Sequence, residues 1–225
     1  MVEGDGRRGP RARPRIGVIS DTHGYLDPRI PRLFRGVTHI IHAGDVVDPA
    51  ILSTLEAIAP LTAVSGNVDG DELAAALPGE VTGEIGGVHF VVGHKRKRLM
   101  KRLAAGRYAV GPDGAPPDLV VFGHDHVPAA AWIDGTVFLN PGTASSPDEE
   151  DDGPTVAIVE TMPTGLAVRF IPLERSPNAQ RRHQRPKPPA EERKAQRERP
   201  AAREAAPEVD AGGMTHAGGM THVAG

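Results

Sequence analysis

Apolar residues in the first part of the chain alternate between short strand-like runs and segments with helical spacing. Residues 15–20, 38–42 and 61–65 are strand-like runs rich in Ile and Val. Helical spacing is predicted at about residues 28–35 and again at residues 49–59. Strand–helix–strand alternation of this kind predicts a parallel sheet whose strands are connected by crossover helices.

After residue 80 the pattern changes to closely spaced strands. The strand-like runs cover residues 80–85, 87–93, 118–123, 130–134, 136–140, 155–160 and 166–171. The pairs Gly86-Gly87 and Asp134-Gly135 are typical of hairpin turns, and one helix is predicted at about residues 96–105. The whole pattern indicates an α/β protein in which two sheets pack face to face with helices outside.

Both ends of the chain lack this pattern. Residues 1–14 are rich in Gly, Pro and Arg and predict a disordered N-terminal extension. A single folded domain is predicted for residues 15–173. Residues 174–225 contain few large apolar side chains and predict a disordered Pro/Arg/Ala-rich tail. The tail contains the hexapeptide AGGMTH twice in succession, for which we have no physical explanation.

Composition narrows the classes of function. A net charge of −3 over 225 residues makes the whole molecule a poor general binder of nucleic acid. The chain has no cysteine, which excludes disulfides, thiolate metal sites and thiol nucleophiles. A metal must therefore be bound by oxygen and imidazole ligands, which suits Mn, Fe, Zn or Ni. No apolar run approaches the roughly 20 residues that span a membrane or forms a signal peptide, so a cytoplasmic location is predicted.

Polar residues that can bind metal directly follow five of the predicted strands. They lie in the segments 20–24, 42–45, 65–69, 93–94 and 123–126. Ligands of open α/β sheets bind outside the carboxyl ends of the strands, so these segments predict one shared site. Because residues i and i+2 of an extended segment point the same way, we expect Asp21 and His23 to bind one cation together. By the same reasoning, His124 and His126 approach the site from the opposite side.

The motifs SDTHG, HAGDV, GNVD, GH and GHDH, followed by NPGT, resemble those of the calcineurin-like metallophosphoesterase superfamily. They are most similar to its small YfcE-type phosphodiesterase branch, over residues 15–173. The resemblance implies a four-layer α/β/β/α sandwich of two mixed sheets flanked by helices. It also implies seven ligands for two divalent metal ions: Asp21, His23 and His126 for the first, Asn67, His94 and His124 for the second, and Asp45 as a bridge between them.

The resemblance implies a metal-dependent phosphoric ester hydrolase, with Mn as the expected ion and Fe, Zn or Ni as alternatives. We expect phosphodiesters to be hydrolysed by in-line attack of a hydroxide that bridges the two ions, with Asp45, Asn67 and His94 as catalytic residues. The alternatives are a phosphomonoesterase, a nuclease-type activity, or a non-catalytic scaffold like the retromer subunit that resembles this family. A small-molecule phosphoester is the expected partner, nucleic acid is an alternative partner, and relatives of the family suggest a homodimer.

Two positions depart from the wider family pattern. Many phosphatases of the superfamily carry a His directly after the motif Asn, where it protonates the leaving group, whereas this chain has Val68 followed by Asp69. Because general acid catalysis contributes about 10²–10⁴-fold in rate, we expect activated aryl diesters to react better than simple alkyl monoesters. In addition, Lys95 and Arg96 follow His94, where the branch often has a small residue and a second His.

Three further features each allow two interpretations. Asp69 is interpreted as a strap for the loop of Asn67 rather than as an acid that faces the substrate. His42 either orients a metal ligand or is a structural histidine with satisfied hydrogen bonds. The six basic side chains within residues 95–102 form either a solvated helix face, which we slightly favour, or a basic lip that attracts phosphate substrates.

Overall fold

The structure is a computed structural model, and it describes residues 13–108, 111, 114–145 and 153–173. Most of the predicted extension and the whole predicted tail with its AGGMTH repeat lie outside the described residues. At the boundary, the carbonyl of Pro14 accepts hydrogen bonds from the backbone N–H and the hydroxyl of Thr161, at 3.4 and 3.2 Å. Within the described ranges, no helix is long and apolar enough to cross a membrane.

The first five-stranded sheet contains the strands of the N-terminal alternation. Strands β1 (Arg15–Ile19), β2 (His39–His42) and β3 (Leu61–Ala63) are parallel neighbours, as the sequence pattern predicts. Strand β9 (Thr155–Met162) pairs antiparallel with β1, and β10 (Gly165–Pro172) pairs antiparallel with β9. The strand order is therefore β10-β9-β1-β2-β3, and the sheet is mixed.

The second five-stranded sheet is also mixed. Its strands are β4 (Glu80–Ile85), β5 (Val88–Gly93), β6 (Leu119–Val121), β7 (Ala129–Ile133) and β8 (Thr136–Asn140). Their order is β4-β5-β6-β8-β7, with β5, β6 and β8 parallel and the two edge strands antiparallel. The predicted hairpin turns are confirmed. Gly86 and Gly87 have φ of 58° and 92°, and Asp134 and Gly135 have φ of 49° and 84°, the positive values that a type I′ turn requires.

Four short helices connect these strands in the described residues. They are α1 (Ile30–Leu33), α2 (Pro49–Glu56), α3 (Asp71–Ala76) and α4 (Arg96–Ala104). Helix α2 begins with a proline in its first turn, and the Asp48 side chain accepts a hydrogen bond from the N–H of Ala50. Helix α1 is shorter than predicted, because Pro31 and the left-handed Gly36 (φ 77°) confine it to one turn. Helix α3 was not predicted, because only Leu73 of its six residues is buried.

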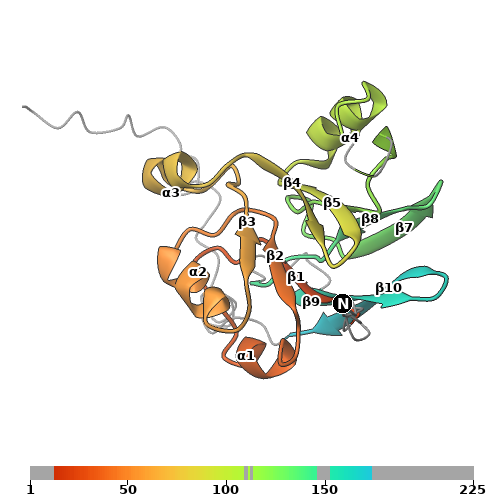
Figure 1. Cartoon of the computed structure of the whole chain (residues 1–225). Helices are drawn as coiled ribbons and strands as arrows, with labels where there is room; N and C mark the ends of the chain where they lie inside the picture. The colour runs from red at the N-terminus through yellow and green to blue at the C-terminus, as the bar shows by residue number, and fades with distance from the viewer. Residues whose placement is uncertain (1–12, 109–110, 112–113, 146–152, 174–225) are drawn as a thin grey trace, which may run out of the picture. The chain divides into compact units, whose positions relative to one another are not determined.

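Three apolar clusters separate four layers. One apolar core lies between the sheets and includes Phe90 and Val92 of β5, whereas the intervening Val91 faces outward. Another apolar core packs α1, α2 and α3 against the first sheet. The remaining apolar core packs Leu99 of α4 against the second sheet. Figure 1 shows α1 and α2 beside β1–β3, and α4 beside the second sheet. The predicted α/β/β/α sandwich is therefore confirmed.

Candidate metal centre

All seven predicted ligands lie on loops that follow the carboxyl ends of β1, β2, β3, β5 and β6. Two groups of their donor atoms lie close together. The first cluster consists of Asp21, His23 and His126, and the second cluster of Asp21, Asp45 and His94, and within each group the ligand atoms lie within 4.8 Å of one another. The structure thus brings distant motifs to one site, and Asp21 is the member that both clusters share.

The first cluster is compact. The Nε2 atoms of His23 and His126 are 3.1 Å apart, and His126 Nε2 lies 3.4 Å from Asp21 Oδ1. Asp21 is fully buried, whereas the two histidines are half-buried at the rim. Two imidazole nitrogens and a carboxylate oxygen that converge in this way form a donor set that suits a divalent transition-metal ion.

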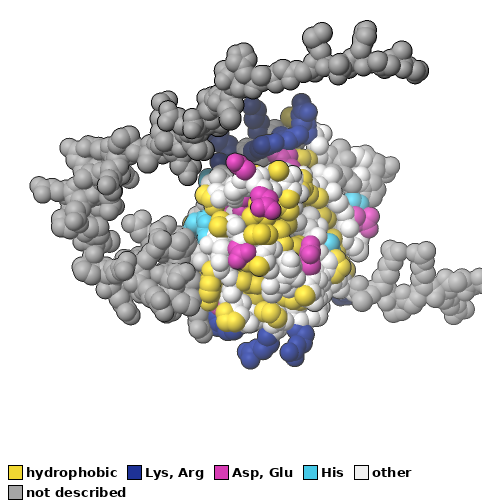
Figure 2. Space-filling view, turned by 90° about the vertical axis from the view of Figure 1, so that its left-hand side faces the viewer, with side chains coloured by type: hydrophobic (Ala, Val, Ile, Leu, Met, Phe, Trp, Pro, Cys, Tyr) yellow, Lys and Arg dark blue, Asp and Glu magenta, His cyan; other side chains and the backbone are white. Residues whose placement is uncertain are grey.

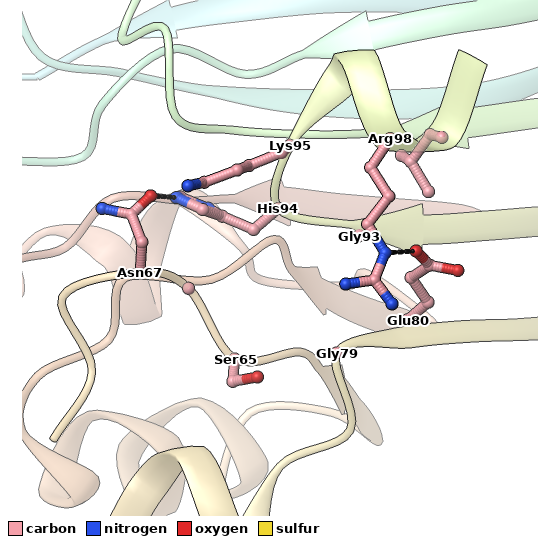
Figure 3. A pocket seen from close by; sticks show the side chains of 10 residues that line it. Ser65, Asn67, Gly79, Glu80, Gly93, His94, Lys95 and Arg98 are labelled. Atoms are coloured by element: carbon pink, nitrogen blue, oxygen red, sulfur yellow. Dashed lines mark hydrogen bonds and ion pairs between the residues drawn. The ribbon is translucent and has the colours of Figure 1, made fainter. Parts of the chain in front are cut away.

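The second cluster lies deeper. His94 Nε2 is 3.3 Å from Asp45 Oδ2 and 3.1 Å from Asn67 Oδ1, and Figure 3 shows Asn67 and His94 pointing toward each other. His94 Nδ1 lies 2.8 Å from the carbonyl oxygen of Ala43. Because a carbonyl only accepts hydrogen bonds, Nδ1 carries a proton, and Nε2 is the nitrogen that faces Asp45 and Asn67. With a proton, Nε2 donates to Asp45; in the neutral ring, its lone pair is available to a metal ion.

Asp21 and His23 lie in one donor group, as expected, but the extended backbone from which this was predicted is wrong. Asp21, His23, Asp45, His124 and His126 all have left-handed backbones, with φ of 53°, 46°, 56°, 73° and 58°. As a result, His124 and His126 diverge. His126 joins His23 in the first cluster, whereas His124 lies in neither donor group and its ring packs edge-on against His94, with ring centroids 5.1 Å apart. The two histidines of GHDH diverge because the loop turns sharply between them.

This left-handed backbone is concentrated at the site. Among the described non-glycine residues, only Val47 and Asp134 share it with the five ligands. Each such residue costs on the order of 1–3 kcal/mol and persists only where its surroundings fix it. Here the N–H of Asp21 donates to the Gly44 carbonyl at 3.0 Å, and the N–H of His124 donates to the Asp21 carboxylate at 3.1 Å. Hydrogen bonds between the loops therefore hold the ligands in a strained arrangement.

The electrostatics favour the protonation states that metal ligands need at Asp45 and His23, and oppose the neutral state at His94. Burial raises the pKa of Asp45, but the hydrogen bonds from His94 and from the N–H of Val68 outweigh it and lower the pKa to about 2. Burial lowers the pKa of His23, although Asp21 partly offsets this. Burial also acts to lower the pKa of His94, but the hydrogen bond to Asp45 reverses the direction, so the pKa is raised. A cation at the second cluster therefore competes with a proton held by His94 and Asp45.

Asp69 is the strap that the sequence interpretation favoured. Its Oδ1 accepts a hydrogen bond from the N–H of Val47, and its Oδ2 accepts one from the N–H of Gly66, each at 2.7 Å. The carboxylate therefore joins the loop after β2 to the loop after β3, which carry Asp45 and Asn67. Because both oxygens are engaged with the backbone, Asp69 is not an acid that faces the substrate.

His42 is a structural histidine with satisfied hydrogen bonds. The ring is fully buried, Nδ1 accepts a hydrogen bond from the N–H of Gly44 at 3.3 Å, and Nε2 lies 3.2 Å from the Thr22 hydroxyl. This pattern assigns the proton to Nε2, which donates to Thr22, while Thr22 donates to the Val46 carbonyl. Burial lowers the pKa of His42 to about 4, so the ring is neutral near pH 7.

The sequence interpretation gave no role to the side chains of the NPGT motif, which follows β8. The Asn140 amide donates to the Gly123 carbonyl at 3.2 Å, and the Thr143 hydroxyl donates to the Asp21 carbonyl at 2.8 Å. Both side chains are buried. They position the two loops that supply the first cluster, and their signal was similar to that of the ligands: polar residues at the end of a predicted strand or shortly after it.

Two glycines allow the loops to approach one another. A Cβ atom on Gly66 would overlap the Asp45 carboxylate, and one on Gly123 would lie 2.5 Å from Asp21 Oδ2. Neither neighbour is the end of a long flexible side chain, so a larger residue would displace a ligand. The glycines in GNVD and GHDH are therefore required by packing against the carboxylates.

Comparisons with known proteins show which proteins this chain is similar to. The sequence model of the calcineurin-like phosphoesterase superfamily domain matches residues 15–163. A probable metallophosphoesterase of Methanocaldococcus jannaschii is 34% identical over 196 residues, which cover 77% of this chain and 96% of that protein. A phosphodiesterase of the same organism is 26% identical over 147 residues, which cover 57% of this chain and 82% of that protein.

The fold also occurs among solved structures. Vacuolar protein sorting 29 from Cryptosporidium parvum superposes with a TM-score of 0.51 at 19% identity, over 72% of this chain and 99% of that protein. At this level of identity the similarity concerns the fold alone. The side chains of the metal centre, rather than the arrangement of strands and helices, must therefore distinguish between functions.

Proposed function

The chain belongs to the calcineurin-like phosphoesterase superfamily, and from this premise we propose that it is a phosphodiesterase that depends on two divalent metal ions. The observation that carries the proposal is the convergence of five carboxylate and imidazole ligands in two donor groups that share Asp21, with Asn67 and His124 in contact with His94. We further propose a small-molecule phosphoester as substrate, a cytoplasmic location and a homodimeric state.

The residues present fit two ions. Asp21, His23 and His126 would hold the first ion, and Asp21, Asp45, Asn67, His94 and His124 would hold the second. The set contains nitrogen and oxygen donors without sulfur, which supports Mn, with Fe, Zn or Ni as alternatives. When bound, the ions supply positive charge opposite the phosphate oxygens and lower the pKa of water, so that hydroxide is available near neutral pH.

The protein's own residues prepare this chemistry. Asp45 stays ionised well below neutral pH, because His94 and the N–H of Val68 both donate to it. The Ala43 carbonyl holds the His94 ring in one orientation. Asn67 adds a neutral oxygen donor, so a site already rich in carboxylate gains a ligand without further negative charge.

The absence of a histidine after Asn67 supports the preference for diesters with good leaving groups. The side chain at that position is Val68, which is 48% exposed and has no proton to give. The adjacent Asp69 is engaged by two backbone N–H groups. Without a general acid at this position, we expect an aryl leaving group, which departs without protonation, to be favoured over an alkyl alkoxide by about 10²–10⁴-fold.

The completeness of the ligand set supports an enzyme over a scaffold on the same fold. A protein used only for assembly is under no requirement to maintain buried carboxylates and left-handed ligands, which cost stability. All seven positions are filled here, and five of them have left-handed backbones.

The proposal is tested by the hydrolysis of three substrates by the Mn-loaded protein: bis-p-nitrophenyl phosphate, p-nitrophenyl phosphate and a single-stranded oligonucleotide. We expect the aryl diester to react fastest and EDTA to abolish the reaction. Faster hydrolysis of the monoester would identify a phosphomonoesterase, and faster cleavage of the oligonucleotide a nuclease. A protein that binds two ions and cleaves none of the three would contradict the proposal.

A further inference from the structure

A cavity of about 250 Å³ opens beside the second cluster. The polar side chains that line it are Ser65, Asn67, Glu80, His94, Lys95 and Arg98. Figure 3 shows Asn67 and His94 on one side of this space and the Arg98–Glu80 pair on the other, with Lys95 extending toward Asn67. A group that occupied the cavity would therefore lie directly beside the proposed metal centre.

The charged side chains of this cavity have a positive balance. Glu80 has three polar partners. Its Oε1 forms an ion pair with Arg98 Nε at 2.5 Å, and its Oε2 accepts hydrogen bonds from Arg102 Nη1 at 2.8 Å and from the Tyr108 hydroxyl at 2.6 Å. Two guanidinium groups thus share one carboxylate. Within the described part of the chain, no carboxylate lies within ion-pair distance of Lys95. The cavity therefore presents uncompensated positive charge next to the phosphate site.

This charge does not stabilise the helix on which it lies. Lys95 is the N-cap of α4, and the first turn contains three further cations and no acidic residue. Cations at a helix N-terminus oppose the helix dipole, at about 0.3–1 kcal/mol each on an exposed surface. Helix α3 has the favourable arrangement, with Asp71 and Glu72 in its first turn. A local arrangement that costs stability is expected where it serves binding.

The basic side chains are visible at the surface. Figure 2 shows Lys and Arg side chains gathered at the upper edge of the molecule, at the height where Figure 1 places α4. Lys97 and Lys101 are exposed and do not line the cavity. The two interpretations of residues 95–102 therefore apply to different members: part of the helix is a solvated face, and Lys95 and Arg98 line the cavity.

We propose that this cavity binds a second anionic group of the substrate, and that Lys95 and Arg98 select phosphodiesters that carry such a group. The inference rests on the proposed function, because it assigns a substrate class to the same site. The chemical class is a small phosphodiester with an additional phosphate. A volume of about 250 Å³ lies just below the roughly 300–1,000 Å³ of sites that enclose a whole drug-sized ligand. It therefore suits a phosphorylated fragment of a small substrate rather than a polymer.

The test compares the binding of two probes that differ by one phosphate. Isothermal titration calorimetry measures the Kd of thymidine 3′,5′-bisphosphate and of thymidine 5′-monophosphate for the wild type, Lys95→Ala and Lys97→Ala, with and without Mn. We expect the wild type to bind the bisphosphate about tenfold more tightly than the monophosphate, as one charge-assisted contact would give. Lys95→Ala should reduce this preference to threefold or less, and Lys97→Ala should retain it.

Two results would overturn the inference: a wild-type preference below twofold, or an equal loss of preference in Lys97→Ala, which would indicate only general attraction to the basic helix. The hydrolysis of bis-p-nitrophenyl phosphate by the same preparations separates this inference from the proposed function. A preference that depends on Lys95 in a protein without esterase activity would support the anion subsite and contradict the phosphodiesterase. An active enzyme without the preference would support the phosphodiesterase and contradict the anion subsite.

Discussion

The two clusters of the metal centre differ in how the protein holds them. In the second cluster, Asp21, Asp45 and His94 are all at most 4% exposed, and backbone groups fix the side chains of Asp45 and His94. In the first cluster, the two histidines lie half-buried at the rim, with their Nε2 atoms 3.1 Å apart. Hydrogen bonds within the protein therefore order the second cluster. We expect the order of the first cluster to depend more on the proposed metal ion.

Asp21 is the residue that joins these two clusters. Asp21 is buried, belongs to both donor groups, and accepts a hydrogen bond from the N–H of His124. The sequence interpretation gives the bridging role to Asp45, and that role stays a prediction. In the structure, Asp45 is grouped only with the second cluster, so substitutions of Asp21 and Asp45 should have different effects on the two ions.

The largest effect is expected from Asp21→Asn. Because Asp21 contributes to both clusters, its neutralisation should lower the affinity for both ions and reduce diesterase activity by at least about 10³-fold, more than the 10–100-fold typical of residues that only support a ligand. Activity and bound Mn are measured on the same preparation. Asp125→Asn is the matched control, because it makes the same charge change on the exposed surface of the GHDH loop. Equal losses in both variants would contradict the role of Asp21.

Gly66→Ala should have the next largest effect, with a loss of activity of about 100-fold. The new Cβ would overlap the Asp45 carboxylate and displace it from His94. Overpacking of this kind costs about 1–3 kcal/mol in stability. Gly70→Ala, on the same loop, is the control, because nothing lies within 4 Å of its added Cβ. Thermal unfolding and kcat are measured for both, and an active Gly66→Ala enzyme would mean that the second cluster is less rigid than described.

A smaller effect, about 10- to 100-fold in activity, is expected from Asp69→Ala. The substitution leaves the N–H groups of Val47 and Gly66 without their acceptor and should lower the free energy of unfolding by about 1–3 kcal/mol. Because Asp69 connects the loops of Asp45 and Asn67, the variant should lose the ion of the second cluster before that of the first. Stepwise removal of metal by a chelator measures the order in which the two ions are lost. The opposite order would contradict the role of Asp69 in connecting the loops of Asp45 and Asn67.

The smallest effect on activity at neutral pH is expected from His42, which is buried behind the ligands. Its pKa is lowered from 6.5 to about 4, so the unfolded state binds the proton more readily than the folded state. Its stabilising contribution is complete above pH 6.5 and is lost as the pH falls toward 4, by about 3 kcal/mol in total. Urea unfolding of the metal-free protein from pH 7.5 to 4 should show this loss, and His42→Gln should reduce it. An unchanged pH dependence in His42→Gln would contradict the assignment.

Sequence periodicity was sufficient to predict most of the fold, because a strand that packs on one or both faces of a sheet has a characteristic spacing of apolar residues. In β5, the alternation of Phe90, Val91 and Val92 between two apolar clusters is visible as a continuous apolar run. The pairing of β9 with β1 could not be predicted in this way, because it joins residues about 140 positions apart. Helix α3 was also missed, because one buried Leu73 does not make a helical pattern.

The ligand positions were predictable as a set, but their backbone geometry was not. Glycine-flanked Asp, Asn and His at five strand ends are a local signal. The left-handed conformation of His23 and His126 depends on hydrogen bonds between loops, which no local pattern encodes. The family resemblance had already assigned His124 and His126 to different ions, whereas extended spacing alone placed them together; the folded loop supplies the physical reason for their divergence.

The central claim is that the seven side chains bind two ions, and metal content measured by inductively coupled plasma mass spectrometry tests it most directly. The wild type, reconstituted with Mn and freed of excess metal, should contain two ions per chain. Asp45→Asn should retain one ion, held by Asp21, His23 and His126, and Asp21→Asn should retain none. A wild type that binds one ion or none, or an Asp45→Asn variant that still binds two, would contradict the account.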